Sequence, residues 1–304
     1  MTSSEHAATI DTSALVGGRR VFRRSRWASL RSFARQKPLG AVGGAIIILL
    51  LIVALLSSVL APYGYDTIKV SDRLLGMSWS HPFGTDEQGR DIFSRIIYGS
   101  RVTVYIGFGA IILSTAIATV IGMVSGYFTG LFDLLMQRVI DVWLSFPGLI
   151  FVIFIVSIFS NHTPILILTL GFLYAAGASR IIRSSTISIK ESQYVESARS
   201  IGASHLRILT RHIFPNVIPI VIITASIQIG SVILLTASLS FLGFGPPPPF
   251  PSWGRMLQEA RPQMVYHPNL AIFPGLAIAI VVYAFNMFGD AIRDVMDPRM
   301  RGAR

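Results

Sequence analysis

Long uncharged apolar runs dominate this sequence and constrain its fold more than any other feature. The first of them, residues 39–60, holds 22 uncharged residues and would be about 33 Å long as an α-helix, close to the ~30 Å hydrocarbon core of a bilayer. Inside a bilayer, a helix satisfies its backbone polar groups within one segment. With 52% apolar and only 13% charged residues, the chain is predicted to be an all-α integral membrane protein.

The apolar runs predict six membrane-spanning helices. They are expected at residues 39–60, 104–127, 142–160, 165–179, 216–238 and 270–288. Pro147 is expected to kink the third helix near its start. A short polar turn is expected before that helix, at Asp133, Arg138 and Asp141. A four-residue spacing typical of closely packed helices is seen at Gly122, Gly126 and Gly130.

The first span and the polar segment after it are expected to form one unit, residues 38–101. In that segment Thr85 and Gln88 have the spacing of a capping box, which predicts a helix starting near Asp86. The helix would have one apolar face, formed by Ile92, Phe93, Ile96 and Ile97. Such a pattern is typical of a helix that lies in the membrane interface or packs against neighbouring spans.

Positive charge predicts the orientation of the chain. If six spans are present, 19 of the 26 Lys and Arg residues fall in segments on the same side as the termini, and such residues concentrate on the cytoplasmic side. Residues 1–37 are therefore expected to be a basic cytoplasmic tail and residues 291–304 a cytoplasmic C-terminal tail. Because the basic residues flank apolar runs, the expected partner is the lipid bilayer and not nucleic acid.

The residue patterns of common catalytic and metal sites are missing. The chain has no cysteine, no HExxH pair among its six histidines, and no G-x-x-x-x-G-K-[ST] phosphate loop. No predicted span has an ionisable side chain near its middle, whereas proton- or ion-driven carriers usually need one. We therefore expect no catalytic residue, metal site or cofactor in this chain, and an energy source on another subunit. A self-sufficient secondary transporter or channel is the alternative, and an intramembrane enzyme is a third class.

A polar stretch, residues 194–219, separates the fourth and fifth spans. Residues 191–201 favour a short helix, and Gly202 suits the left-handed position that ends it. A second helical stretch is expected from Ser204, with Pro215 at the start of the fifth span. The two apolar faces are expected to consist of Tyr194, Ala198 and Ile201, and of Leu206, Leu209 and Ile213. Charge places this helix–turn–helix on the cytoplasmic side.

The spacing of Glu196, Ala198, Gly202 and Pro215 resembles the coupling motif of bacterial ABC importer permeases. That motif reads E-A-A, three residues, G, nine residues, I, any residue, L-P. Three positions depart from it, namely Ser197, His212 and Phe214. The sequence RHIFPN at 211–216 is similar to the dipeptide and oligopeptide branch of these permeases. So are FGTDEQGRD at 83–91, SRIIYGSRV at 94–102, PSWGRML at 251–257, FPGLAI at 273–278 and GDAIRDVMDPR at 289–299. The likeness covers about residues 35–300.

The resemblance implies the type I ABC importer permease fold and a non-catalytic subunit of an ATP-driven importer. Residues 102–290 would form the core permease domain and half of the translocation pathway, with residues 191–215 as the coupling region. The implied ATPase-coupling residues are Tyr194, Glu196, Ser197, Ala198, Gly202 and Ala203, followed by His212, Pro215 and Asn216 at the turn into the fifth span. The implied partners are a second homologous permease, expected to be a different chain, two ATPase subunits that bind ATP and Mg²⁺, and an extracytoplasmic binding protein. The implied location is the bacterial cytoplasmic membrane.

Two further sets of residues are candidate sites. One is a rigid docking edge for the binding protein, formed by Pro246, Pro247, Pro248, Pro249 and Trp253, unless that run only reverses the chain. The other consists of polar residues that either face the pathway or bond between helices, namely Gln228, Ser231, Thr236 and Asn286. A peptide is the expected cargo. A dipeptide, a longer peptide, nickel and haem stay open, as does the pairing of two identical copies.

Overall fold

The structure is a computed structural model that describes residues 33–296, as helices joined by turns and loops. Contacts divide the chain into residues 1–38 and 39–304, and the two predicted tails lie mostly outside the described residues. The long helices are α2 (Pro38–Leu55), α4 (Ile92–Phe128), α7 (Thr163–Lys190), α10 (Phe214–Phe241) and α12 (Asn269–Met296). The shorter elements are α3 (Ser57–Leu60), η2 (Val70–Asp72), α5 (Gly130–Leu144), α6 (Gly148–Phe159), α8 (Gln193–Ser200), α9 (His205–Arg207), η3 (Ile208–Ile213) and α11 (Trp253–Ala260).

The apolar runs are membrane-spanning helices by length and composition. Within residues 33–296, five helices are long and apolar enough to cross a membrane, and the broken pair α5–α6 makes a sixth if it counts as one span. The all-α prediction is confirmed, and so are the predicted helices at 104–127, 165–179, 216–238 and 270–288. The span predicted at 39–60 is α2, which ends at Leu55, followed by the separate short helix α3. Helix α7 continues beyond the fourth predicted span, past Arg180 and Arg183, and ends at Lys190, just before the polar stretch.

The third predicted span, residues 142–160, is not one helix. It is divided between the end of α5 and α6, and the two helices meet at 83°. Pro147 precedes α6, and it breaks the helix because it lacks an N–H group and disfavours helical backbone at Phe146. The predicted polar turn before this span is also wrong, because helix α5 carries Asp133, Arg138 and Asp141.

The helix predicted to start near Asp86 begins later and is not separate from the second span. Thr85 forms an isolated antiparallel bridge with Asp91. The Asp91 carboxylate then caps α4 by accepting a hydrogen bond from the backbone N–H of Ser94 at 2.7 Å. No helix breaker follows, so the predicted interfacial helix is the first part of the 37-residue α4. Its first residue, Ile92, is 1% exposed, which shows that its apolar face packs inward.

Glycines bring α4 and α7 into close contact. A Cβ atom on Gly122 would lie 2.6 Å from the Ser179 carbonyl oxygen, and one on Gly126 would lie 2.8 Å from the Arg183 carbonyl oxygen. The predicted packing role is confirmed for these two residues. It is wrong for Gly130, which starts α5 at a φ of +73° and has open space beside its Cα atom.

Helix α11 was not predicted from the sequence. Ser252 Oγ caps this helix by accepting from the backbone N–H of Arg255 at 3.4 Å. Trp253, Met256 and Ala260 are buried at helical spacing. A capping serine followed by an apolar stripe at i, i+3 and i+7 was the available signal.

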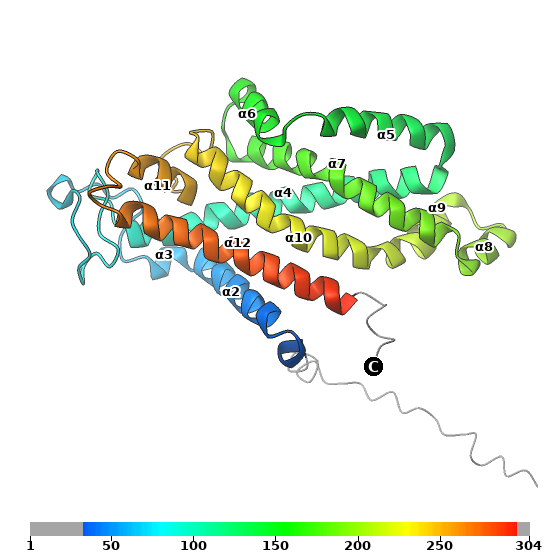
Figure 1. Cartoon of the computed structure of the whole chain (residues 1–304), viewed down its shortest axis with the longest axis horizontal. Helices are drawn as coiled ribbons and strands as arrows, with labels where there is room; N and C mark the ends of the chain where they lie inside the picture. Colours follow the sequence, from blue (N-terminus) through cyan, green and yellow to red (C-terminus); the bar gives the residue numbers. More distant parts are fainter. Residues whose placement is uncertain (1–32, 297–304) are drawn as a thin grey trace, which may run out of the picture. The chain divides into compact units, whose positions relative to one another are not determined.

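The long helices α4, α7, α10 and α12 run between two ends of the bundle (Figure 1). Helices α8 and α9 lie at one end, called here the α8 end, and α11 lies at the other, called the α11 end. A cluster of buried apolar side chains near the α8 end joins α4, α7, α8, η3 and α10 through Tyr127, Ile182, Val195, Ile208 and Val217. This cluster seats the polar stretch on the bundle.

Candidate functional site

The predicted turn after α8 forms around Gly202. Gly202 has a φ of +79°, in the left-handed region that favours glycine. Its N–H donates to the Arg199 carbonyl oxygen at 3.0 Å, and the N–H of Ala203 donates to the Ala198 carbonyl oxygen at 3.1 Å. These two bonds make a complete Schellman ending, so the sharp turn predicted at Gly202 is confirmed.

The two faces of α8 differ from the prediction. Tyr194, Ala198 and Ile201 were predicted to form one face, but Tyr194 and Ile201 are 45% and 86% exposed, and Ala198 is buried at 6% exposure beside Val195 at 0%. An eight-residue helix is seated by one i, i+3 pair, and the rest of its surface faces outward. The outward residues include Glu196 and Ser197. The α8 end thus presents polar and apolar side chains together, as a protein interface does.

The second helical stretch begins at Ser204 as predicted, but its buried stripe is shifted. Leu209 and Ile213 are buried as predicted, while Leu206 is 72% exposed and Ile208 is fully buried. The reason is a π-helix over residues 208–213. Its extra residue per turn rotates the buried stripe relative to an α-helical pattern.

The three residues predicted at the turn into the fifth span lie where the π-helix meets α10, with His212 in the π-helix and Pro215 and Asn216 in α10. Pro215 is in the first turn of that helix, where its missing N–H costs least. The Asn216 side-chain amide donates to the His212 carbonyl oxygen at 2.7 Å. These residues shape the junction between the π-helix and α10, and Pro215 and Asn216 are exposed.

Ion pairs between α5 and α7, which the sequence reasoning missed, support this end of the bundle. Arg183 Nε donates to an Asp133 carboxylate oxygen at 2.6 Å, and the same carboxylate accepts from the Ser125 hydroxyl. Asp133 is only 8% exposed. A second pair joins Arg180 to Asp141. Buried carboxylates need such partners, but partners 50 residues apart in sequence leave no local pattern.

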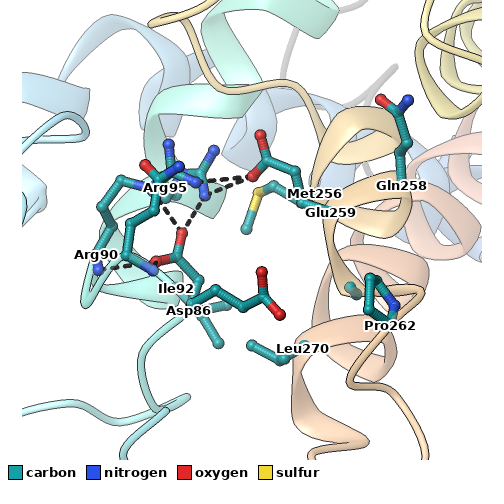
Figure 2. Close-up of a pocket in the computed structure, with 12 residues that line it drawn as sticks. Asp86, Arg90, Ile92, Arg95, Met256, Gln258, Glu259, Pro262 and Leu270 are labelled. Carbon is teal, nitrogen blue, oxygen red and sulfur yellow. Dashed lines mark hydrogen bonds and ion pairs between the residues drawn. The ribbon is translucent and has the colours of Figure 1, made fainter. Parts of the chain in front are cut away.

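At the α11 end, charged side chains from three segments meet beside a pocket of about 380 Å³ (Figure 2). Arg90 donates to Asp86 at 2.7 Å and to Glu259 at 2.8 Å. Arg95 is 2% exposed and bonds to the same two carboxylates. Nearby, burial lowers the pKa of the Arg255 guanidinium, while Glu259 opposes that shift. The cluster fastens the polar segment and α11 to the start of α4.

The proline loop is only partly exposed. Pro246 is buried and Pro247 is half-buried, while Pro248 and Pro249 are exposed, as is the adjacent Phe250 at 55%. Trp253 does not fit the predicted docking edge. It is 4% exposed, and its indole N–H donates to the Ile96 carbonyl oxygen at 3.0 Å, so it anchors the loop to α4.

The candidate pathway residues do not converge on one site. Thr236 is 8% exposed, and its hydroxyl donates to the Val232 carbonyl oxygen at 2.7 Å. This bond lies within α10 and is neither a pathway contact nor a bond between helices. Asn286 lines an otherwise largely apolar groove of about 720 Å³ between α10 and α12. The structure places the other two in α10, with Gln228 half-buried and Ser231 exposed.

Comparisons with known proteins agree on one family. Residues 118–302 match the family described as binding-protein-dependent transport system inner membrane component. Residues 25–76 match the N-terminal TM domain of oligopeptide transport permease C. The chain is 38% identical over 280 residues to the glutathione transport system permease protein GsiD of Escherichia coli O6:K15:H31, covering 92% of each chain. It is 39% identical over 280 residues to GsiD of Pectobacterium atrosepticum, covering 91% of this chain and 93% of the relative.

A solved structure shows the same fold. It is a chain of the MetNI methionine ABC transporter in inward-facing conformations, with a TM-score of 0.57 and 15% sequence identity. The match covers 67% of this chain and 96% of that chain. The arrangement of helices is therefore that of an ABC importer permease.

Proposed function

Because this chain belongs to the family of inner membrane components of binding-protein-dependent transport systems, and is a permease subunit of an ABC importer, we propose that α8 couples its membrane helices to ATPase subunits on other chains. The resemblance to the dipeptide and oligopeptide permease branch is confirmed by both relatives and the oligopeptide permease domain. ATP and Mg²⁺ would bind on those ATPase subunits, as expected for a non-catalytic permease.

One observation carries the proposal: α8 is seated on the bundle but left open on its outer side. Val195 and Ala198 hold it from within, and the turn at Gly202 fixes its end. Exposed apolar side chains on this end, Tyr194, Ile201 and Leu206, are better suited to a protein partner than to water. Glu196 adds a carboxylate for a charge-assisted hydrogen bond to that partner.

The proposed assembly follows from the predicted orientation of the chain in the membrane. The α8 end would face the cytoplasm together with both termini, as the distribution of Lys and Arg predicts, and the α11 end would face the binding protein. Family members act with a second permease, an ATPase and a binding protein. We propose here a heterodimer of permeases with two ATPase subunits.

The proposed cargo is a short peptide. Both GsiD relatives are named as glutathione transport permeases, and glutathione is itself a modified tripeptide. The match to the N-terminal domain of an oligopeptide permease supports the same chemical class.

The experiment measures binding-protein-stimulated ATP hydrolysis by the reconstituted complex. Glu196→Lys and Gly202→Val are expected to abolish stimulation and transport while membrane insertion is kept. Full stimulation in the two α8 variants, or transport by this chain alone in liposomes, would contradict the proposal.

We also propose that the exposed part of the proline loop contacts the binding protein. The residues that would make this contact are Pro248, Pro249 and Phe250, because they are exposed and Trp253 is buried. A backbone restricted by proline loses little entropy on binding. Replacing the two prolines with Gly and Ser should weaken binding-protein affinity, and an unchanged affinity would mean that the loop only reverses the chain.

A further inference from the structure

Tyr127, in the last turn of α4, contacts the segments on both sides of α8. Its hydroxyl is hydrogen-bonded to Nδ1 of His205, the first residue of α9, at 2.7 Å. On the other side, Nζ of Lys190, the last residue of α7, lies 5.7 Å from the centroid of the Tyr127 ring. The segments immediately before and after α8 therefore both contact the Tyr127 side chain, which is only 4% exposed.

The turn that follows Tyr127 is held by the same two residues. Lys190 Nζ donates to the Thr129 hydroxyl at 3.3 Å, and the His205 ring lies 5.8 Å from the Phe128 ring. Thr129 has a φ of +37°, which is strained for a residue other than glycine. The end of α4 is thus fixed by contacts to both flanks of α8.

The buried face of α8 shares an apolar cluster with the Tyr127 ring. Val195 of α8 and Ile208 of the π-helix are both fully buried in that cluster. Close-packed side chains do not shift one at a time. A displacement of α8 must therefore carry the end of α4 with it or break the bond between Tyr127 and His205.

We propose that Tyr127 is the positioning residue that transmits movement of α8 to α4, through its hydrogen bond to His205. This inference rests on the proposed function and adds to it the route by which motion reaches the membrane helices. The apolar cluster and Lys190 hold the ring, which also lies 5.6 Å from the His205 ring. The hydroxyl supplies the hydrogen bond between α4 and α9.

The test compares variants in the reconstituted complex with its ATPase subunits and substrate-loaded binding protein. Tyr127→Phe and His205→Ala each remove the hydrogen bond, and His205→Gln keeps a partner for the hydroxyl. Tyr105→Phe is the matched control, because it makes the same change on α4 at a side chain that is 62% exposed. The readouts are stimulated ATP hydrolysis, substrate moved per ATP, the amount of ATPase bound and the midpoint of thermal unfolding.

We expect Tyr127→Phe and His205→Ala each to lower stimulation by about fivefold, the effect of losing one net hydrogen bond, with ATPase binding unchanged. The double variant should be no worse than either single variant, His205→Gln should recover most of the stimulation, and Tyr105→Phe should match the wild type.

Unchanged stimulation and transport per ATP in both single variants would overturn the link, and so would losses that multiply in the double variant. Two other results would instead contradict the proposed function of α8, on which the link rests. If the wild-type complex shows no stimulation, or if Gly202→Val keeps all of it, the proposed function of α8 fails and the link fails with it.

Discussion

Substitutions at Gly202 separate the cost of a left-handed backbone conformation from the cost of a side-chain clash. Its φ is +79°, which disfavours most side chains, yet a Cβ atom built there has no other atom within 4 Å. A new side chain therefore meets no clash, and its cost is the backbone conformation alone. The series Gly202→Asn, Gly202→Ala and Gly202→Val is predicted to lose coupling in that order.

The magnitudes follow from the left-handed backbone. Asparagine visits this region more readily than other non-glycine residues, so its cost is the smallest. Alanine costs roughly 1–2 kcal/mol, and valine costs more because a β-branched residue is an outlier at positive φ. Since ~1.4 kcal/mol is about a tenfold change in population, we expect a slight loss of stimulated ATP hydrolysis for Asn, about tenfold for Ala and more for Val.

The assay is binding-protein-stimulated ATP hydrolysis in liposomes, with the midpoint of thermal unfolding measured on the same preparations. The midpoint should change little, because the turn is exposed and lies at one end of the bundle. Equal activity across the three variants would refute the reasoning. A loss that follows side-chain volume, with Asn worse than Ala, would show that steric contact with a partner matters and backbone conformation does not.

Other predictions concern stability and can be checked by thermal unfolding in detergent. Gly126→Leu should destabilise the chain by about 1–3 kcal/mol, because its Cβ atom would lie 2.8 Å from the Arg183 carbonyl oxygen. Asp133→Leu should cost roughly 3 kcal/mol by leaving Arg183 without its buried partner, and the double variant with Arg183→Leu should cost less than the single one. Trp253→Phe should cost about 1 kcal/mol through the lost bond to the Ile96 carbonyl oxygen.

Most of the fold could be predicted from the lengths of the uncharged apolar runs and from local signals that end helices. A run of apolar residues must be helical in a membrane, which gave the second, fourth, fifth and sixth spans. The turn at Gly202 was also predictable, because ending a helix in the left-handed region is a local requirement.

Competition between local signals explains the errors. Thr85 has the spacing of a capping residue, but the Asp91 carboxylate caps α4 and Thr85 pairs with it across a tight loop. The apolar residues of the third span fit one helix, but Pro147 bends the chain by 83°. Hydropathy counts residues and does not register such a break.

Contacts distant in sequence were not predictable from one chain. The pair Asp133–Arg183 and the bond from Tyr127 to His205 join residues 50 and 78 positions apart, and no spacing rule covers such distances. The outward position of Tyr194 and Ile201 could not be read either, because an eight-residue helix is seated by only two buried side chains.

Contact between α8 and an ATPase subunit can be tested directly by crosslinking. Since the chain has no cysteine, a single cysteine can be placed at Ile201, which is 86% exposed at the α8 end, or as a control at Trp79, which is 103% exposed in the polar segment before α4. Each variant complex is labelled with a maleimide–benzophenone reagent, illuminated, and resolved by mass spectrometry. We expect Ile201→Cys to crosslink to the ATPase subunit and Trp79→Cys not to do so. An Ile201→Cys complex that transports substrate but gives no ATPase crosslink, or gives no more than the Trp79→Cys complex, would contradict the proposed contact.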